Sequence, residues 1–279
     1  MRLVRGISLL FFVTVLGLSG CAVNEVVTAE ETVLVVAESP PDESLLLDIG
    51  IVQFKDGIPK NNKPIDTGIY EEIRSAETNY LAYHLKTTLQ GTGHWGAVRV
   101  VPSSTAYTDI TIRGEIEESD GEFVTLAISV TDSRGESWYQ KDYSTQTGIS
   151  SYSINRDKRK DPYQKVFNDI ANDLRAYAAQ LPPKTVQQVR QVSELRFFAD
   201  MSPRAYGEHL ATDRDGMTTP ARLPAENDPS VARLRQIRER DRLVVDTLNE
   251  HYANFYYGIA IPYHSWRKTA REEAINYRQ

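Results

Sequence analysis

The stretch TDITIRGEIEESDGEFVTLAISVTD, residues 108–132, decides the fold. Its two halves alternate apolar and polar side chains, and a period of two is typical of strands with one buried face. The Asp120-Gly121 pair between them has the chemistry of a hairpin turn. The stretch therefore predicts an antiparallel β-hairpin.

Similar patterns extend outward from this hairpin. Apolar runs of strand length predict three more strands, at residues 45–54, 95–102 and 137–144. Apolar side chains at helical spacing predict a helix over 71–90 and a second one from Asp161-Pro162, a favourable helix start, to 181. Residues 45–181 thus have the order β-α-β-β-β-β-α. This order predicts an α/β (α+β) domain in which a mixed β-sheet carries two packed helices.

The remainder, residues 182–279, is predicted to be a helical C-terminal region without a family resemblance. We expect helices over 184–201 and 203–210, followed by a polar connector over 211–229. A long helix is expected from Pro229 to about Tyr257, ended by Gly258 and Pro262, with one more short helix over 263–277.

The N-terminus has the pattern of an export signal. Arg2 and Arg5 precede an apolar run over residues 7–18, which is shorter than the roughly 20 residues of a membrane-spanning helix. The residues that follow, Leu18-Ser19-Gly20-Cys21, resemble the bacterial lipobox. This resemblance implies a signal peptide over 1–20 that is cleaved before a lipid-modified Cys21. The alternative is an ordinary signal peptide, or a membrane anchor, that happens to contain a cysteine.

A lipid on Cys21 predicts the place of the protein in the cell. Ala22, in place of an aspartate after the cysteine, favours the outer membrane within the family's sorting rule. Residues 21–44 are then a lipidated, acidic tether, in which Thr32–Ala37 has a slight preference for a strand. We expect a soluble body that faces the periplasm and is held to the membrane by acyl chains.

Composition excludes several classes of protein. Cys21 is the only cysteine, which leaves no disulfide framework, thiolate metal site or catalytic thiol in the mature chain. Without Arg2 and Arg5, 30 basic residues face 38 acidic ones, and an acidic surface argues against nucleic acid as a partner.

Four segments of the α/β domain carry a resemblance to known families: IGIVQF (49–54), LQGTGHWGAVRVVP (89–102), TDITIRGEIEESDG (108–121) and LAISVTDSRGESWYQKDY (126–143). In this order they resemble the periplasmic domain shared by the N-terminal module of TolB, the curli-secretion lipoprotein CsgG and the auxiliary lipoproteins of lipid-directed ABC transporters. Asp132, Gly135 and Trp138 keep the order of a D-x-x-x-G-x-x-W turn with a shorter first spacing. The resemblance implies an association with transport or secretion. Segments like the pore-forming ones of CsgG are absent.

No pattern in the chain specifies a reaction. The five histidines, His84, His94, His209, His251 and His264, lack the paired spacing of a metal site. The sequence has no G-x-S-x-G nucleophile motif and no phosphate-binding loop. We therefore expect no cofactor, no metal and no catalytic residue. An envelope hydrolase with a site in the C-terminal half is the alternative, and it would bring His209, His251 or His264 together with carboxylates in a cleft.

Two groups of residues in the C-terminal region are candidates for partner binding. The arginine cluster with Arg235 and Arg238 is either a solvated helix face or a docking face for an acidic partner, lipid head group or glycan. The aromatic segment 251–266, with Tyr256, Tyr257, Tyr263 and Trp266, either packs against the α/β domain or forms an exposed patch.

These observations together predict a non-catalytic outer-membrane lipoprotein. It would act as a structural or accessory subunit of a cell-envelope assembly and bind an envelope protein through its α/β domain or its C-terminal helices. Binding of a lipid or glycan is the other alternative.

Overall fold

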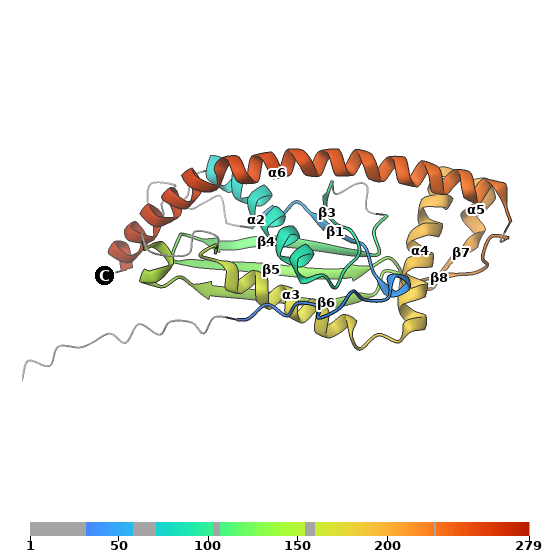
Figure 1. The fold of residues 1–279 in the computed structure, drawn as a ribbon, viewed down its shortest axis with the longest axis horizontal. Coiled ribbons are helices and arrows are strands. Elements are labelled where there is room, and N and C mark those ends of the chain that lie inside the picture. Colours follow the sequence, from blue (N-terminus) through green and yellow to red (C-terminus); the bar gives the residue numbers. More distant parts are fainter. Residues whose placement is uncertain (1–31, 58–70, 103–106, 154–159, 226, 279) are drawn as a thin grey trace, which may run out of the picture.

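The computed structural model describes residues 32–57, 71–102, 107–153, 160–225 and 227–278. A mixed β-sheet with packed helices forms its centre, which confirms the predicted α/β fold (Figure 1). The predicted β-α-β-β-β-β-α order is also confirmed, with one additional two-residue strand, β2. The elements are β1 (Ile49–Val52), β2 (Lys55–Asp56), α2 (Glu71–Thr92), β3 (Val98–Val101), β4 (Ile110–Ser119), β5 (Phe123–Asp132), β6 (Ser137–Gln146) and α3 (Gln164–Ala178).

The sheet combines parallel and antiparallel pairing. Its main strands follow the order β3-β1-β4-β5-β6, in which β1 is parallel to both neighbours and β4, β5 and β6 form an antiparallel meander. Ile51 of β1 lies between Val100 of β3 and Ile112 of β4. The short β2 continues the line of β1 and pairs with β4. The predicted hairpin thus supplies β4 and β5, two of the three ten-residue strands of the sheet.

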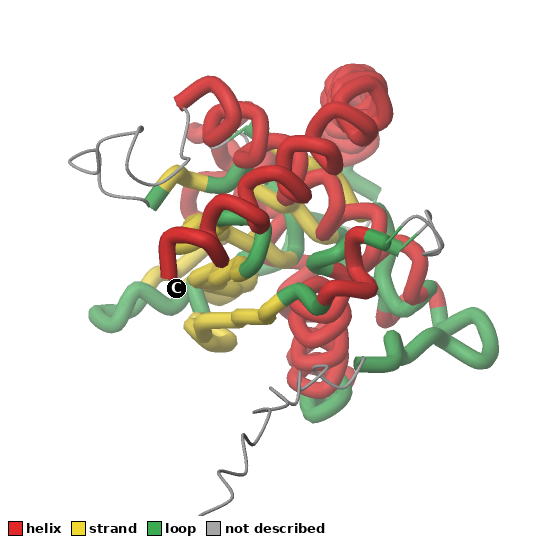
Figure 2. The backbone as a smooth tube through the Cα atoms, turned by 90° about the vertical axis from the view of Figure 1, so that its left-hand side faces the viewer, coloured by secondary structure: helices red, strands yellow, loops and turns green. Residues whose placement is uncertain are grey.

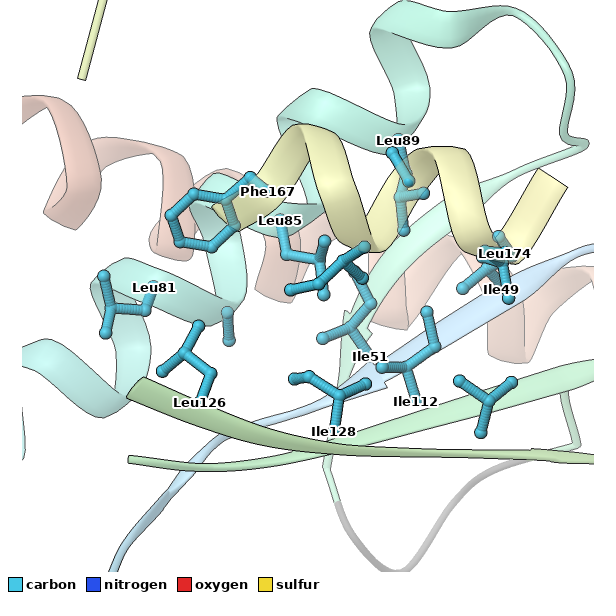
Figure 3. Packing of buried hydrophobic residues seen from close by; sticks show 14 of the residues in the cluster. Ile49, Ile51, Leu81, Leu85, Leu89, Ile112, Leu126, Ile128, Phe167 and Leu174 are labelled. Atoms are coloured by element: carbon cyan, nitrogen blue, oxygen red, sulfur yellow. The ribbon is translucent and has the colours of Figure 1, made fainter. Parts of the chain in front are cut away.

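The core lies between one face of the sheet and helices α2 and α3 (Figure 3). Every second residue of β5 from Val124 to Val130 is buried, as the alternation predicts. The opposite face of the sheet exposes polar side chains such as Arg113 and Gln140. The fully buried side chains that α2, α3 and the strands contribute include Leu81, Leu85, Leu89, Phe167, Ile170, Leu174, Ile49, Ile51, Ile110 and Ile112.

The turn between β5 and β6 explains the Asp132-Gly135-Trp138 motif. The Asp132 carboxylate accepts hydrogen bonds from the backbone N–H of Arg134 at 2.8 Å and from the Trp138 indole at 3.1 Å. Gly135 has φ +94°, a conformation that favours glycine. The motif therefore has a structural role in this chain.

The segment Thr32–Ala37 is extended but forms no strand, so the preference for a strand there is wrong. Side chains of α3 take the place of a neighbouring strand. Asn172 accepts a hydrogen bond from the Val35 N–H at 2.9 Å and donates one to the Val33 carbonyl at 2.9 Å, while Asn168 donates to the Thr32 carbonyl at 2.7 Å. These bonds satisfy the backbone without a ladder.

The C-terminal region contains more than helices. Helices α4 (Pro183–Met201) and α5 (Pro203–Tyr206) occur where helical structure is predicted, and α5 continues into a short 3-10 turn. The expected polar connector contains a small antiparallel hairpin, β7 (Leu210–Thr212) and β8 (Thr218–Pro220). Its turn includes Gly216 at φ +87° and the Asp213 side chain, which accepts two backbone N–H groups. A second, smaller apolar cluster around Phe198 joins this end of the molecule to the last helix.

The last helix, α6 (Pro229–Arg278), is continuous over 50 residues, so the predicted end at Gly258 and Pro262 is wrong. Contacts with the body of the protein hold the helix on both sides of Pro262, and they outweigh the one backbone hydrogen bond that a proline removes. Figure 1 shows the helix bending toward its C-terminal end, as expected of a helix with an internal proline.

None of the helices in the described ranges has the length and apolar character needed to cross a bilayer. The predicted signal peptide, its cleavage motif Leu18-Ser19-Gly20 and the lipidation residue Cys21 lie outside the described residues.

Candidate functional site

Helix α6 is the element around which the candidate site is built. It follows edge strand β3 and crosses α2, from α4 at one end to the β4–β5 turn at the other (Figure 1). Seen from the C-terminal end, the helix passes in front of the strands (Figure 2). The side of α6 that faces the sheet, α2 and α4 is here called the inner side, and the opposite half the outer side.

A buried ion pair attaches the C-terminal part of the inner side. The Arg267 guanidinium donates to both carboxylate oxygens of Asp161 at 2.8 Å, and the two side chains are 2% and 6% exposed. The guanidinium also lies over the ring of Tyr263, 4.3 Å from its centroid. Burial alone would raise the pKa of Asp161, but the charge and hydrogen bonds of Arg267 outweigh it and hold this pKa well below its usual value. The pair is therefore ionised at neutral pH.

A second buried carboxylate, Glu77 of α2, lies nearby. It accepts hydrogen bonds from Arg74 at 2.6 Å, from Ser119 at 2.6 Å and from the Tyr263 hydroxyl at 2.5 Å. Burial raises the pKa of Glu77, against the opposing charge of Arg74. Tyr263 thus connects α6 to both α2 and, through Glu77 and Ser119, to the end of β4.

His84 of α2 completes the same contact. Its Nδ1 is 2.6 Å from the Tyr256 hydroxyl and its Nε2 is 2.9 Å from the Gln164 amide oxygen. Burial lowers the pKa of His84, which favours the neutral ring at physiological pH. With both ring nitrogens occupied, this histidine has a structural role.

The predicted aromatic residues are divided by this packing, so they do not form an exposed patch. Tyr263 is buried and Tyr256 is half-buried against Tyr80 and His84. Trp266 is half-buried and stacks on Tyr263. Only Tyr257 of the four is largely exposed, at 67%. The interpretation of this segment as packing against the α/β domain accounts for three of them.

The backbone of α6 approaches the β4–β5 turn very closely. Gly121 of this turn has φ +87°, and a Cβ at this position would overlap the Arg267 carbonyl oxygen. Arg278, in the last turn of the helix, forms ion pairs with Asp120 and Glu122 beside the same glycine. The hairpin turn predicted from Asp120-Gly121 is thus also the place where α6 is attached.

The N-terminal half of the inner side borders a polar cleft of about 600 Å³, here called the arginine cleft. Its walls are α4, α6 and the turn Glu43–Leu45, and it lies at the amino-terminal ends of β1 and β4, next to Asp48 and Asp109. Four arginines line it, one from α4 and three from α6: Arg190, Arg235, Arg238 and Arg242. Both predicted arginines, Arg235 and Arg238, are among them.

The base of the arginine cleft is a network of hydrogen bonds between its acidic side chains and the backbone. Asp48 accepts from the Ala97 N–H at 2.9 Å and from Arg242 at 3.0 Å. A Cβ at Gly96 would overlap the Asp48 carboxylate, so a larger residue at this position would displace that carboxylate. Asp109 accepts from the Asp48 N–H at 2.9 Å and from the Ser193 hydroxyl at 2.5 Å. Burial raises the pKa of Asp109.

The outer side of α6 has a different composition. Six large apolar side chains on it are exposed, and four of them expose more than half of their surface: Leu243 at 59%, Val244 at 61%, Tyr257 at 67% and Ile261 at 80%. The other two are Ile237 and Leu248. Because α6 is attached to the body of the protein along its inner side, these side chains are held in place on the surface.

Each of the three histidines that an envelope hydrolase would use has its own set of neighbours. The Nδ1–H of His209 donates to the Arg222 carbonyl at 3.1 Å and its ring contacts Tyr206, while His264 stacks on Tyr152 and His251 is exposed. In the part of the chain that the structure describes, no three His, Cys, Asp or Glu side chains are placed to hold a metal ion.

The sequence alone did not identify the residues that attach the inner side of α6 or the apolar residues that the helix exposes. Asp161 is interpretable from sequence only as a helix start, a role it keeps by accepting the Tyr163 N–H at 2.9 Å. Its partner Arg267 is 106 residues away, and nothing local distinguishes it from the exposed arginines of the same helix. Arg190 and Asp48 likewise have no local signal. The exposed apolar residues could have been noted as members of the helical pattern that fall outside its inner stripe.

No protein-family model matches this chain, and none of the curated proteins compared with it does. Three solved structures are similar to about half of it: the hypothetical protein CT253 from Chlamydia trachomatis (12% identity, 48% of this chain and 99% of that one, TM-score 0.31), a PelC dodecamer from Paraburkholderia phytofirmans (17%, 48% and 91%, 0.27) and protein XCC0632 from Xanthomonas campestris, of the family model DUF330 (9%, 55% and 94%, 0.30). Likeness at this level carries no inference about function. Membership in the TolB, CsgG or ABC-auxiliary families stays a prediction.

Proposed function

We propose that this protein is a non-catalytic accessory lipoprotein of a bacterial cell-envelope assembly. It is held at the outer membrane by acyl chains on Cys21 and binds a protein subunit of the assembly through the outer side of α6. The anchor is supported by the order of charge, apolar run, small residues and cysteine at the N-terminus.

The observation that carries the partner surface is the exposure of Leu243, Val244, Tyr257 and Ile261 on one helix. Single exposed apolar residues are common on soluble proteins, whereas several of them exposed on one helix are typical of protein interfaces. At 1.5 Å per residue, the distance along α6 from Leu243 to Ile261 is about 27 Å, so these side chains offer an elongated contact. Burial of this surface would stabilise a complex by roughly 25 cal/mol per Å² of apolar area.

The rigidity of α6 supports the same function. The helix is attached near its middle by Asn249, and further along by Tyr263, Arg267 and Arg278. A surface that is held in its binding conformation loses little conformational entropy on association. The geometry therefore suits a docking rod better than a lid that moves over a catalytic centre.

Photocrosslinking in intact cells tests this function. A photoreactive residue at Val244 or Ile261 should give a crosslink to one envelope protein, and the same residue at Gln140, on the open face of the sheet, should not. Val244→Lys and Ile261→Lys should abolish co-purification of that protein without lowering the melting temperature. A crosslink pattern that is the same at all three positions, or that survives both lysine substitutions, would contradict the proposal.

The anchor needs a separate arm of the experiment. Cys21→Ser should move the protein from the membrane fraction to the soluble periplasmic fraction. A Cys21→Ser protein that still fractionates with membranes would exclude lipid as the anchor, whatever the crosslinks show.

A further inference from the structure

The outer side of α6 is accessible to another helix. Figure 1 shows α6 along the upper edge of the molecule, so its outer side faces away from the sheet. Two residues of this side, Thr247 and Gly258, are small and exposed, and a Cβ added at Gly258 would meet no atom within 4 Å. A glycine allows a second backbone to come close. The surface can therefore pack tightly against a helix of a partner.

The exposed apolar side chains are arranged symmetrically along α6. The centre of the arrangement lies between residues 252 and 253. Val244 and Ile261 are at equal distances from this centre, and so are Leu248 and Tyr257. If a second copy of α6 runs in the opposite direction past the same centre, Val244 of each copy lies beside Ile261 of the other, and Leu248 beside Tyr257. The surface is thus complementary to itself, as the interface of a two-fold symmetric dimer must be.

Charges at the two ends of this surface favour the same antiparallel arrangement. Arg233 and Arg240 are exposed toward the N-terminal end of α6, and Glu272 and Glu273 toward its C-terminal end. None of these four side chains forms an ion pair with another described residue. Because Arg233 and Glu272 are equidistant from the centre, opposite charges approach each other at both ends of an antiparallel pair. A parallel pair would place each of the four beside its own copy.

The remaining charges of the outer side do not reverse this preference. Two of them already form ion pairs within the protein, Arg235 with Glu194 and Glu239 with Arg242. Lys268 would lie opposite Ile237, which is uncharged. Glu250 is next to the centre, where it approaches its own copy in either orientation. The end charges therefore decide between the two orientations.

We propose that the outer side of α6 binds a second copy of this chain, with the two helices antiparallel and crossing at residues 252–253. The inference rests on the proposed function and names the subunit that docks there. Burial of the apolar side chains drives the association, and Thr247 of each copy opposite Gly258 of the other lets the helices approach. Because α6 bends toward its C-terminal end, the contact is centred on 243–262 and the end charges act over a longer distance.

Cysteine crosslinking tests the orientation. Cys21→Ser removes the only cysteine of the chain, so one new cysteine can be introduced into this background. Asn254 is exposed beside the centre, and its two copies would be about 5 Å apart along the helix axis, so Asn254→Cys should give a disulfide-linked dimer on mild oxidation. Arg240→Cys is the matched control, because this exposed residue and its copy would be about 38 Å apart. Crosslinking at Arg240→Cys, or at neither position, would overturn the proposal.

Sedimentation equilibrium of the full chain carrying Cys21→Ser measures the association itself. We expect a dimer that Gly258→Gln weakens by about tenfold or more, because the added side chain separates the helices. The melting temperature in dilute solution should not fall, since the space at Gly258 is open. Gly91→Gln is the matched control, at another exposed helical glycine with open space around it, and should leave the dimer unchanged. An equally stable dimer in Gly258→Gln would overturn the proposal.

This inference and the proposed function can fail separately. A purified chain that stays monomeric at every concentration would overturn self-association, while a crosslink in cells from Val244 to a different envelope protein would still support the proposed function. Conversely, a dimer in solution supports self-association, and identical crosslinks in cells at Val244, Ile261 and Gln140 would contradict docking by this surface in the envelope.

Discussion

Asn249 of α6 forms with Val100 of β3 both hydrogen bonds that a neighbouring strand would form. Its Oδ1 accepts from the Val100 N–H at 2.8 Å, and its Nδ2 donates to the Val100 carbonyl at 2.9 Å. A free edge strand exposes unpaired backbone groups that invite pairing with other chains. Helix α6 thereby covers the β3 edge of the sheet, and the side-chain amide of Asn249 fixes the position of the helix along that edge.

Replacement of Asn249 should therefore destabilise the fold. Asn249→Leu leaves the Val100 N–H and carbonyl without their partner in a buried place, and we expect a loss of about 1–3 kcal/mol in the free energy of unfolding. Urea denaturation measures it. Asn254→Leu, an exposed position on the same helix, should change this free energy by less than about 0.5 kcal/mol. Equal effects of the two substitutions would show that the hydrogen bonds between the Asn249 amide and Val100 do not contribute to the stability of the fold.

The close approach of α6 to Gly121 yields a comparison between two glycines. Gly121 and Gly216 both have φ +87°, but a Cβ at Gly216 meets no atom within 4 Å, whereas one at Gly121 overlaps the Arg267 carbonyl. Gly216→Ala should cost only the left-handed strain of about 1–2 kcal/mol. Gly121→Ala should cost about 1–3 kcal/mol more, because the helix must move. Thermal unfolding of both variants measures the difference. Equal losses of stability would mean that α6 can move away from the β4–β5 turn at no cost in free energy.

The buried pair of Arg267 and Asp161 predicts a non-additive pair of substitutions. Arg267→Met leaves an uncompensated buried carboxylate and should cost about 3–5 kcal/mol. Adding Asp161→Asn removes that charge but keeps an acceptor for the Tyr163 N–H, so the double variant should be more stable than Arg267→Met alone. A double-mutant cycle by urea denaturation measures the coupling. If the losses in the free energy of unfolding of the two single variants simply added up in the double variant, Arg267 and Asp161 would not interact in the folded protein.

Local pattern predicted the α/β half of the molecule because its signals are local. Alternation along β4 and β5 and the glycine at the turn do not depend on what packs against them. The same reasoning gave the wrong end for α6. Pro262 is a strong local stop signal, yet Tyr256 on one side of it and Tyr263 on the other both pack against α2. Tertiary contacts of this kind override local preference.

The candidate sites show the same difference between local sequence signals and tertiary contacts. The density of arginines in 233–242 is visible in the sequence, and it indicated Arg235 and Arg238. Which partner each of these charges meets depends on α4 and on the strand ends, since Arg235 pairs with Glu194 whereas Arg238 donates to the Ser193 hydroxyl. No spacing rule connects residues so far apart in the chain. The sequence therefore locates the helix that bears the site, and the fold selects the residue.

The ionised state of Asp161 predicts how stability responds to acid. Its pKa is held below the ordinary value of 3.8 in the folded protein, so the unfolded chain binds a proton first as the pH falls. The stabilisation is complete above about pH 4 and decreases by about 1.4 kcal/mol per pH unit below that value. In Arg267→Met the cause of the low pKa of Asp161 is absent, and the loss of the same charge raises the pKa of buried Glu77 further, which acts in the same direction. The difference in the free energy of unfolding between the wild type and Arg267→Met should therefore narrow as the pH falls from 5 to 2.5. Urea denaturation over this pH series measures it, and a difference that stays constant would show that Asp161 titrates normally in the folded protein.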